Sequence, residues 1–459
     1  MTIQALLGLA VLNAFLLGVG IAMLWAIRGW RSWAELARLS GFAYMLGVAL
    51  VGVTLSLELV LDVPFSLAAI LVTGAALMLS SVAVRQLFAR WRPVSARERP
   101  RALGFVGAAF GLLVAIYLEA LFRAGRLAGL SAWDAWAFWV PKAKAIYFFG
   151  GLDEQFFREL ANPTYPPLLP ALEASAFHFM GSPDVITLHV QFWFFACGFA
   201  GAVAGLLAPR VPGVVLGPCL LLVIVAPRVA GRNLDPQADF LLDYLFALAA
   251  LLVALWLLDH EPWQLVSASL LLGAAMLTKR EGLLLAACVI AAALVAGWRD
   301  HRYAWPRLGV AAAVAVAVPW RIWFSYRDLE GELPEAGFLG LFGHLDRAWP
   351  AFESVLSTVL DYELWLVIPA LAAAGVVLAF IAGARVLPTF ALVLYGLLIA
   401  GFTWVLWSFT ELELPFVQDE GVNPIVRLTG SLVVVSGGLL PLLLDAAWRG
   451  GDRVTLEES

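Results

Sequence analysis

The chain has 459 residues, of which 62% are hydrophobic and 14% are charged, and its mean hydropathy is +0.88. These values exclude an ordinary water-soluble enzyme, and no nucleic-acid partner is expected. The net charge of −5 says little about partners, because the charges of a membrane protein are divided between two membrane faces.

Long apolar runs separated by polar breaks predict about thirteen membrane-spanning helices. Inside hydrocarbon, each backbone polar group must find its partner within its own segment, so the expected fold class is an all-α polytopic helix bundle. The first run lacks a basic start and is expected to be a retained span. In chain order the predicted spans are residues 4–27, 41–61, 66–86, 102–124, 185–207, 213–227, 240–258, 264–278, 283–298, 308–325, 363–383, 389–409 and 424–446.

The distribution of arginine predicts the orientation. Short loops rich in Lys and Arg stay on the cytoplasmic side, and such loops follow the first, third and ninth predicted spans, with Arg28, Arg31, Arg38, Arg85, Arg90, Arg92, Arg97, Arg99, Arg101, Arg299, Arg302 and Arg307. The N-terminus is then outside and the C-terminus inside. The predicted outer segments are residues 125–184, 228–239, 278–282, 326–362 and 410–423.

The first large outer segment carries ionisable residues among aromatic ones, in SAWDAWAFWVPKAK. We expect two short helices along the membrane surface, the first stopped by Pro141 and the second ending at a glycine pair. Aromatic anchoring needs no carboxylate, so Asp134 is a candidate catalytic acid, with helix capping as the alternative. Lys142 and Lys144 are candidate phosphate contacts, with snorkelling as the alternative. Tyr165, in the proline-rich ANPTYPPLLP, is expected to point its hydroxyl inward.

Three aspartates lie four residues apart in LDPQADFLLDY and would share one face of a helix. Asp235 followed by Pro236 matches an N-cap with proline at the first helical position. Asp239 and Asp243 lie one and two turns deeper, and acids inside the membrane are functional candidates. Asp134 and Asp239 could flank one reaction centre.

A Lys279-Arg280-Glu281 triplet joins two apolar runs with almost no loop. It is either a tight hairpin with a local ion pair or a cationic seat for an anionic headgroup, since arginine suits phosphate by its fork geometry. Glu281 would orient the cations. Arg232 and Arg427 fall on the same predicted side and could join this seat.

These residues favour chemistry on a lipid-borne substrate. No nucleotide-sugar pool exists outside the cytoplasmic membrane, so a donor there must arrive in the membrane, as a polyprenyl-phosphate sugar does. An aspartate acting as general base on the acceptor hydroxyl contributes roughly 10²–10⁴-fold. Fixed cations or a bound divalent metal ion would stabilise the departing phosphate. The acid and the basic turn should therefore open onto one shared cavity.

The layout resembles the GT-C membrane glycosyltransferases. Trp133-Asp134 followed by AWAFWVPKAKA matches the essential Asp of that family's first large outer loop, and ANPTYPPLLP and LTKREG are similar to segments of bacterial members. The resemblance implies that Asp134 is the catalytic base, Asp239 a second acid and Lys279-Arg280 the donor-phosphate contacts. The loop follows the fourth predicted span rather than the first, and it has no paired aspartates, which leaves metal dependence open.

The resemblance also implies three regions. Residues 1–101 hold additional N-terminal helices and a basic cytoplasmic loop, 102–325 a GT-C-like catalytic core, and 326–459 an outer lid-like loop and the C-terminal helices. The implied function is inverting transfer of a sugar from a polyprenyl-phosphate carrier to a lipid, glycan or protein hydroxyl outside the cytoplasmic membrane. The alternatives are a polysaccharide polymerase or ligase that uses diphosphate-linked donors, and a lipid-linked sugar transporter or flippase.

Overall fold

The computed structural model describes residues 1–88, 104–298, 313–329, 345–408 and 424–450. Every regular element in these ranges is a helix. Eight of the helices are long and apolar enough to cross a membrane: α1 (Ile3–Ile27), α2 (Trp33–Val60), α3 (Leu67–Phe88), α4 (Gly104–Gly125), α8 (Val185–Leu207), α11 (Ala238–Asp259), α19 (Val386–Ser408) and α20 (Pro424–Arg449). The chain is therefore an all-α integral membrane protein, as its composition predicts.

Four shorter apolar helices occupy other predicted runs, namely α9 (Gly213–Val225), α12 (Pro262–Thr278), α13 (Glu281–Ala296) and α18 (Ile368–Ile381). The predicted span at 308–325 begins outside the described residues. Its described part is a 3₁₀ turn, Ala313–Ala317, followed by α15 (Val318–Tyr326). At 1.5 Å per residue, α15 alone is too short to cross the hydrocarbon core. The number of membrane crossings thus stays a prediction.

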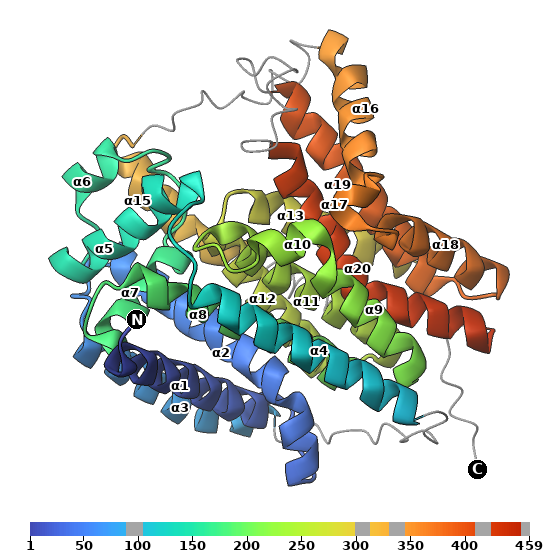
Figure 1. Cartoon of the computed structure of the whole chain (residues 1–459), viewed down its shortest axis with the longest axis horizontal. Coiled ribbons are helices and arrows are strands. Elements are labelled where there is room, and N and C mark those ends of the chain that lie inside the picture. The colour runs from blue at the N-terminus through green and yellow to red at the C-terminus, as the bar shows by residue number, and fades with distance from the viewer. Residues whose placement is uncertain (89–103, 299–312, 330–344, 409–423, 451–459) are drawn as a thin grey trace.

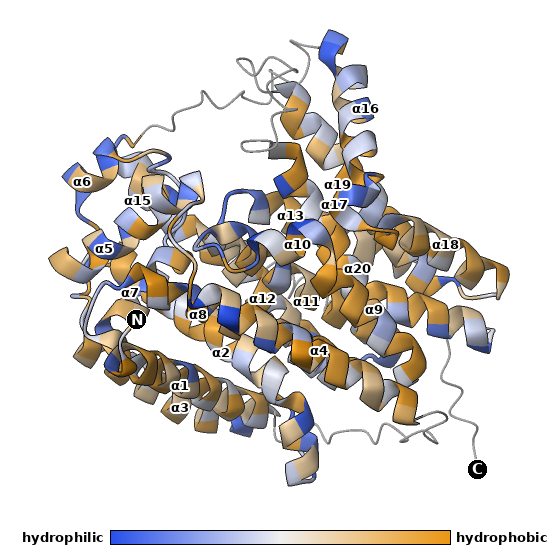
Figure 2. Cartoon of the chain, viewed as in Figure 1, coloured by the Kyte–Doolittle hydropathy of each residue, from blue (hydrophilic) through white to orange (hydrophobic). Residues whose placement is uncertain are grey.

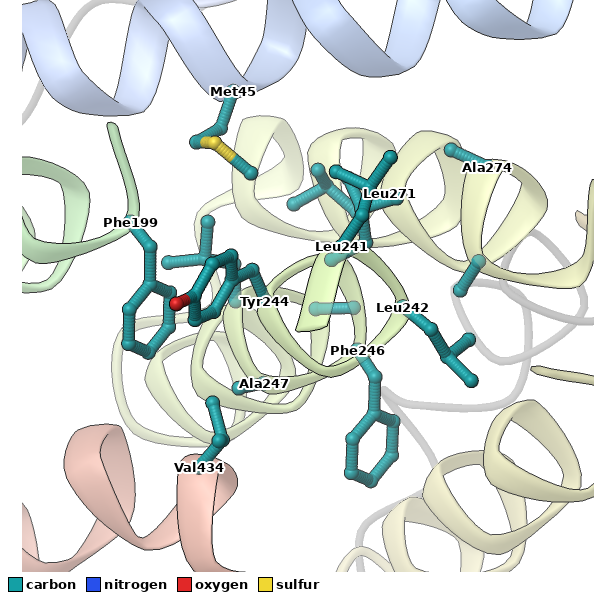
Figure 3. Packing of buried hydrophobic residues seen from close by; sticks show 14 of the residues in the cluster. Met45, Phe199, Leu241, Leu242, Tyr244, Phe246, Ala247, Leu271, Ala274 and Val434 are labelled. Carbon is teal, nitrogen blue, oxygen red and sulfur yellow. The ribbon is translucent and has the colours of Figure 1, made fainter. Parts of the chain in front are cut away.

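Helix α11 forms the centre of the bundle. Every residue from Ala238 to Leu257 is buried, as expected for a helix that is apolar all round. Figure 3 shows Tyr244 of this helix beside Phe199 of α8, and the two rings stack with centroids 4.5 Å apart. Met45 of α2, Leu271 of α12 and Val434 of α20 surround it in the same view.

Basic side chains mark one end of the bundle, which we call the basic end. Arg28 at the end of α1 pairs with Glu35 of α2 at 2.6 Å and lies over the Trp263 ring at the start of α12. Arg85 near the end of α3 donates to the Trp25 carbonyl. The ends of α8, α11 and α20 meet there too, through contacts among Arg210, Asp259 and Arg449. The other predicted basic clusters, at 90–101 and 299–307, lie outside the described residues, as does the C-terminal segment 451–459.

The connecting segments gather at the opposite end. Figure 1 shows α5 (Val140–Phe149), α6 (Glu154–Glu159) and α15 together there, and Figure 2 shows hydrophilic residues in α6 and near α10 (Pro227–Arg232) while the long helices are mainly hydrophobic. The helix α7 (Leu168–Met180) connects this region to α8. On the C-terminal side, the described part of the predicted lid forms a short 3₁₀ helix, Leu345–Arg347, with α16 (Ala348–Val359) and α17 (Tyr362–Trp365). Its residues 330–344 lie outside the described residues.

The prediction that Pro141 stops a first short helix is wrong. A π-helical segment, Ala135–Trp139, continues directly into α5, and Pro141 is near the start of α5. Proline is tolerated in the first turn of an α-helix, where its missing N–H removes no hydrogen bond, and the π-helical segment before α5 leaves Pro141 in that turn. The predicted end at the glycine pair is confirmed, because Gly150 closes α5 in the left-handed conformation at φ 73°.

Candidate functional site

Arg427 joins the two aspartates that the sequence singles out. Its Nε donates to Asp239 Oδ2 at 2.8 Å and its Nη2 to Asp239 Oδ1 at 3.1 Å. The same Nη2 also donates to Asp134 Oδ2. Both aspartates are buried, so each carboxylate needs this cation as compensation. Residues from the π-helix, α11 and α20 therefore meet at one point.

Lys279 extends this group. Its Nζ lies 2.9 Å from Asp239 Oδ1 and 2.8 Å from Glu281 Oε1. The helix α12 ends at Thr278 and α13 begins at Glu281, so the tight turn itself directs the ammonium group inward. We call Asp134, Asp239, Glu281, Lys279 and Arg427 the carboxylate cluster.

The electrostatics of the cluster are set by three acids and two cations in close contact. Burial and the nearby Arg427 lower the pKa of Lys279, but Asp239 and Glu281 outweigh both effects, so the pKa is raised overall. Lys279 is thus a permanent cation at neutral pH. The second oxygen of Glu281, Oε2, is buried without a hydrogen-bond partner among the described residues.

A small cavity lies beside the cluster. This cavity of about 10 Å³ is lined by Asp239, Asp243, Lys279, Glu281 and Arg427, among others, which is at the lower limit for one water molecule. The structure brings the acid and the basic turn together as expected, because Arg427 and Asp239 join Asp134 to Lys279. Asp134 is not among the residues that line this cavity, and a shared cavity that could hold a sugar stays a prediction.

Tyr165 lies beside the cluster in a group of aromatic rings and cations. Its ring stacks on Trp139, with centroids 5.4 Å apart and planes 6° from parallel. Lys279 Nζ lies 5.9 Å and Arg280 Cζ 5.7 Å from the ring centroid. Burial raises the pKa of Tyr165 to about 12, so its hydroxyl remains a hydrogen-bond donor at neutral pH.

The structure places Lys142 inside the protein. Its Nζ donates to the Asn162 carbonyl at 2.6 Å, and the side chain is buried among aromatic rings, including Phe138, Trp139 and Phe157. In this position Lys142 links α5 to the 162–167 segment through its hydrogen bond to Asn162. Lys144, the other predicted phosphate contact, lies two residues further along α5 and is half-buried.

The prediction that Asp235 caps α11 is wrong. The helix begins at Ala238, and Gln237 occupies the N-cap position. Asp235 instead pairs with Arg232 at 3.2 Å, within the turn that follows α10. Burial raises the pKa of Asp235, and Arg232 opposes that shift. The ion pair thus engages Arg232, another of the predicted phosphate contacts.

Asp243 lies one turn deeper than Asp239, as predicted, and accepts a hydrogen bond from the Ser431 hydroxyl of α20. It belongs to the lining of the small cavity but makes no ion pair within the part of the chain that is described. Its position is therefore that of a supporting residue.

Arg228 is a basic residue near the cluster that sequence reasoning overlooked. It lies at the start of α10, half-buried, and makes no ion pair or hydrogen bond with any described residue. Burial lowers its pKa, Asp239 opposes that shift, and Arg232 and Arg427 add to it. The only signal in the sequence is its place next to a proline in a predicted outer segment.

The sequence leaves open whether the protein depends on a divalent metal ion. Among the described residues, no group of three or more His, Cys, Asp or Glu side chains could hold a metal ion. Asp134 and Asp239 are both engaged by Arg427.

Comparison of the chain with protein-family models, with curated proteins and with solved structures finds no match. The GT-C resemblance consequently rests on the residues quoted from the sequence.

Proposed function

We propose that the chain is an inverting glycosyltransferase that moves a sugar from a polyprenyl-phosphate carrier to an acceptor hydroxyl at the extracytoplasmic face of the cytoplasmic membrane. The observation that carries the proposal is the ion-pair bridge of Arg427 between Asp134 and Asp239 at the end of the bundle opposite the basic end. Buried, paired carboxylates beside lipid-accessible helices are what such a reaction needs.

In the proposed reaction, Asp134 accepts the proton of the acceptor hydroxyl while that oxygen attacks the anomeric carbon. The bond from this carbon to the phosphate oxygen breaks, and the lipid phosphate leaves with the electron pair. Attack opposite the leaving group inverts the anomeric centre. Asp239 keeps Arg427 and Lys279 in place, because it contacts both cations.

In the proposed mechanism, Arg427 keeps the site inactive until the donor binds. While Arg427 pairs with Asp134, the guanidinium compensates the charge of the carboxylate and occupies its Oδ2. An incoming phosphate offers Arg427 another anion, and Asp134 is then released to take a proton. Arg228, which is half-buried beside the cluster, offers a further guanidinium for the departing phosphate.

Mass spectrometry of the lipids that copurify with the protein tests the donor class. We expect a polyprenyl-phosphate hexose or pentose, and we expect the purified protein to consume it when an acceptor is supplied. Copurification of a diphosphate-linked glycan would instead favour a polymerase or ligase. A transporter would be indicated if the sugar-phosphate lipid binds without turnover and moves across the vesicle bilayer only when the protein is present.

A further inference from the structure

A second cavity lies beside Tyr165. It encloses about 20 Å³ and is lined by Thr164, Arg280, Trp320 and Arg321 together with apolar side chains of α12, α13 and α15. It shares no lining residue with the cavity at the carboxylate cluster, and no carboxylate lines it. We call it the arginine cleft.

Thr164 supplies an unusual feature of this cleft. The residue is only 2% exposed, and its hydroxyl is buried without a hydrogen-bond partner among the described residues. Its carbonyl is held in place, because it accepts a 3.0 Å hydrogen bond from Trp320 Nε1. An unsatisfied buried hydroxyl costs about 1–3 kcal/mol, and a ligand oxygen would remove that cost.

The two arginines give the cleft its charge preference. Arg280 is held over the Tyr165 ring, and Arg321 is exposed on α15 and makes no ion pair with any residue in the described ranges. Guanidinium groups match phosphate oxygens in fork geometry. The enclosed volume suffices for about one water-sized group, so one phosphate oxygen fits beside Thr164 while the others stay outside, where Arg321 is exposed.

The exposed face of α15 indicates where the phosphate comes from. Val318 and Ile322 are 45% and 63% exposed and lie on the same helical face as Arg321. An exposed arginine beside exposed aliphatic side chains is typical of the lipid–water boundary, where phospholipid headgroups lie.

We propose that the arginine cleft binds the phosphate group of a membrane lipid, at a site separate from the carboxylate cluster. The proposal does not depend on sugar transfer. It would hold equally if the carboxylate cluster had another role.

Native mass spectrometry of the detergent-solubilised full chain tests the proposal with dioleoyl phosphatidate, and with dioleoylglycerol as the matched lipid that lacks the phosphate. We expect phosphatidate to bind at least about tenfold more tightly than dioleoylglycerol. Arg321→Gln and Thr164→Val should each weaken phosphatidate binding about tenfold, the equivalent of one charge-assisted hydrogen bond. Thr164→Ser should keep it, because the hydroxyl is retained.

Arg123→Gln is the control, since it removes an exposed arginine at the end of α4. It should bind phosphatidate like the wild type. Thr164→Val should be at least as stable as the wild type, because it removes a buried hydroxyl that bonds to no described residue. Unchanged phosphatidate binding in Thr164→Val, or in a folded Arg321→Gln, would overturn the proposal. Displacement of phosphatidate by millimolar inorganic phosphate would contradict the lipid assignment and indicate a site for soluble phosphate.

Discussion

Arg427 compensates more buried charge than any other described residue of the cluster, because it alone contacts both Asp134 and Asp239. Neither aspartate has enough exposure to be compensated by water, since both are buried. Removal of the arginine would leave two like charges close together in a poorly hydrated site. The stability of the fold and the geometry of the site therefore depend on the same side chain.

We expect Arg427→Gln to lower the free energy of unfolding by about 3 kcal/mol, the lower part of the range for a broken buried ion pair. We use the lower part of the range because the arginine side chain is still 20% exposed to solvent. Chemical unfolding in detergent measures it. Arg123→Gln, whose ion pair with Glu119 is exposed, should change stability by about 0.5 kcal/mol or less. Equal effects of the two substitutions would contradict the structural importance of Arg427.

The acids and the basic turn could be singled out from sequence because charge is unusual in apolar segments. Asp134, Asp239, Lys279 and Glu281 all meet in the structure. The sequence indicated that Arg427 could join the basic turn. Its bridge between Asp134 and Asp239 could not be predicted, since it depends on how α20 packs against α11.

At the level of elements, hydropathy located the helices well. The long apolar runs became helices because backbone groups in hydrocarbon must pair locally, whatever the tertiary fold. Helix ends and irregularities depend on finer contacts. Pro141 was expected to break a helix but is accommodated by a π-helical segment, and Asp235 was expected to cap α11 but pairs with Arg232 instead. Both departures lie at the end of the bundle that holds the candidate site.

The contact between α1 and α2 depends on glycine. A Cβ added at Gly20 would lie 1.7 Å from the Ala43 carbonyl oxygen, and one at Gly47 would lie 1.9 Å from the Leu16 carbonyl oxygen. These distances are far below van der Waals contact, so the two backbones touch where side chains are absent. Small residues allow such close approach in membrane helices.

We expect Gly47→Ala to destabilise the protein by about 1–3 kcal/mol, because the helices must move apart to make room. Gly111→Ala in α4 is the matched control, since a Cβ there meets nothing within 4 Å. It should leave stability unchanged or raise it by up to about 1 kcal/mol. Thermal unfolding of the two variants compares them directly, and a loss in Gly111→Ala as large as in Gly47→Ala would argue against the close contact.

At the scale of the whole molecule, two groups of ionisable residues lie at opposite ends of the bundle. Arg28, Arg85, Arg210 and Arg449 lie at the basic end, and the carboxylate cluster lies at the other. From the positive-inside rule we expect the basic end to face the cytoplasm and the cluster to face outside. The sequence alone divides the loops into a predicted outer set and a predicted cytoplasmic set. Contacts between helix ends bring the described loops together in the same two sets.

Cysteine labelling tests this orientation in a variant without the native cysteines. We expect a membrane-impermeant maleimide to label Glu159→Cys, exposed on α6, in intact cells. Ala34→Cys, exposed near the start of α2, should react only after the membrane is permeabilised. The reverse pattern would place the carboxylate cluster in the cytoplasm and remove the reason for a lipid-linked donor.

The central claim is that Asp134 is the base of a sugar transfer, and the rate of transfer by Asp134→Asn tests it most directly. The amide keeps the size of the side chain but cannot take up the proton, so we expect the rate from a polyprenyl-phosphate sugar to fall by roughly 10²–10⁴-fold. Glu119→Gln, which neutralises an exposed acid of α4, should transfer at the wild-type rate. Transfer by a folded Asp134→Asn variant at close to the wild-type rate would contradict the claim.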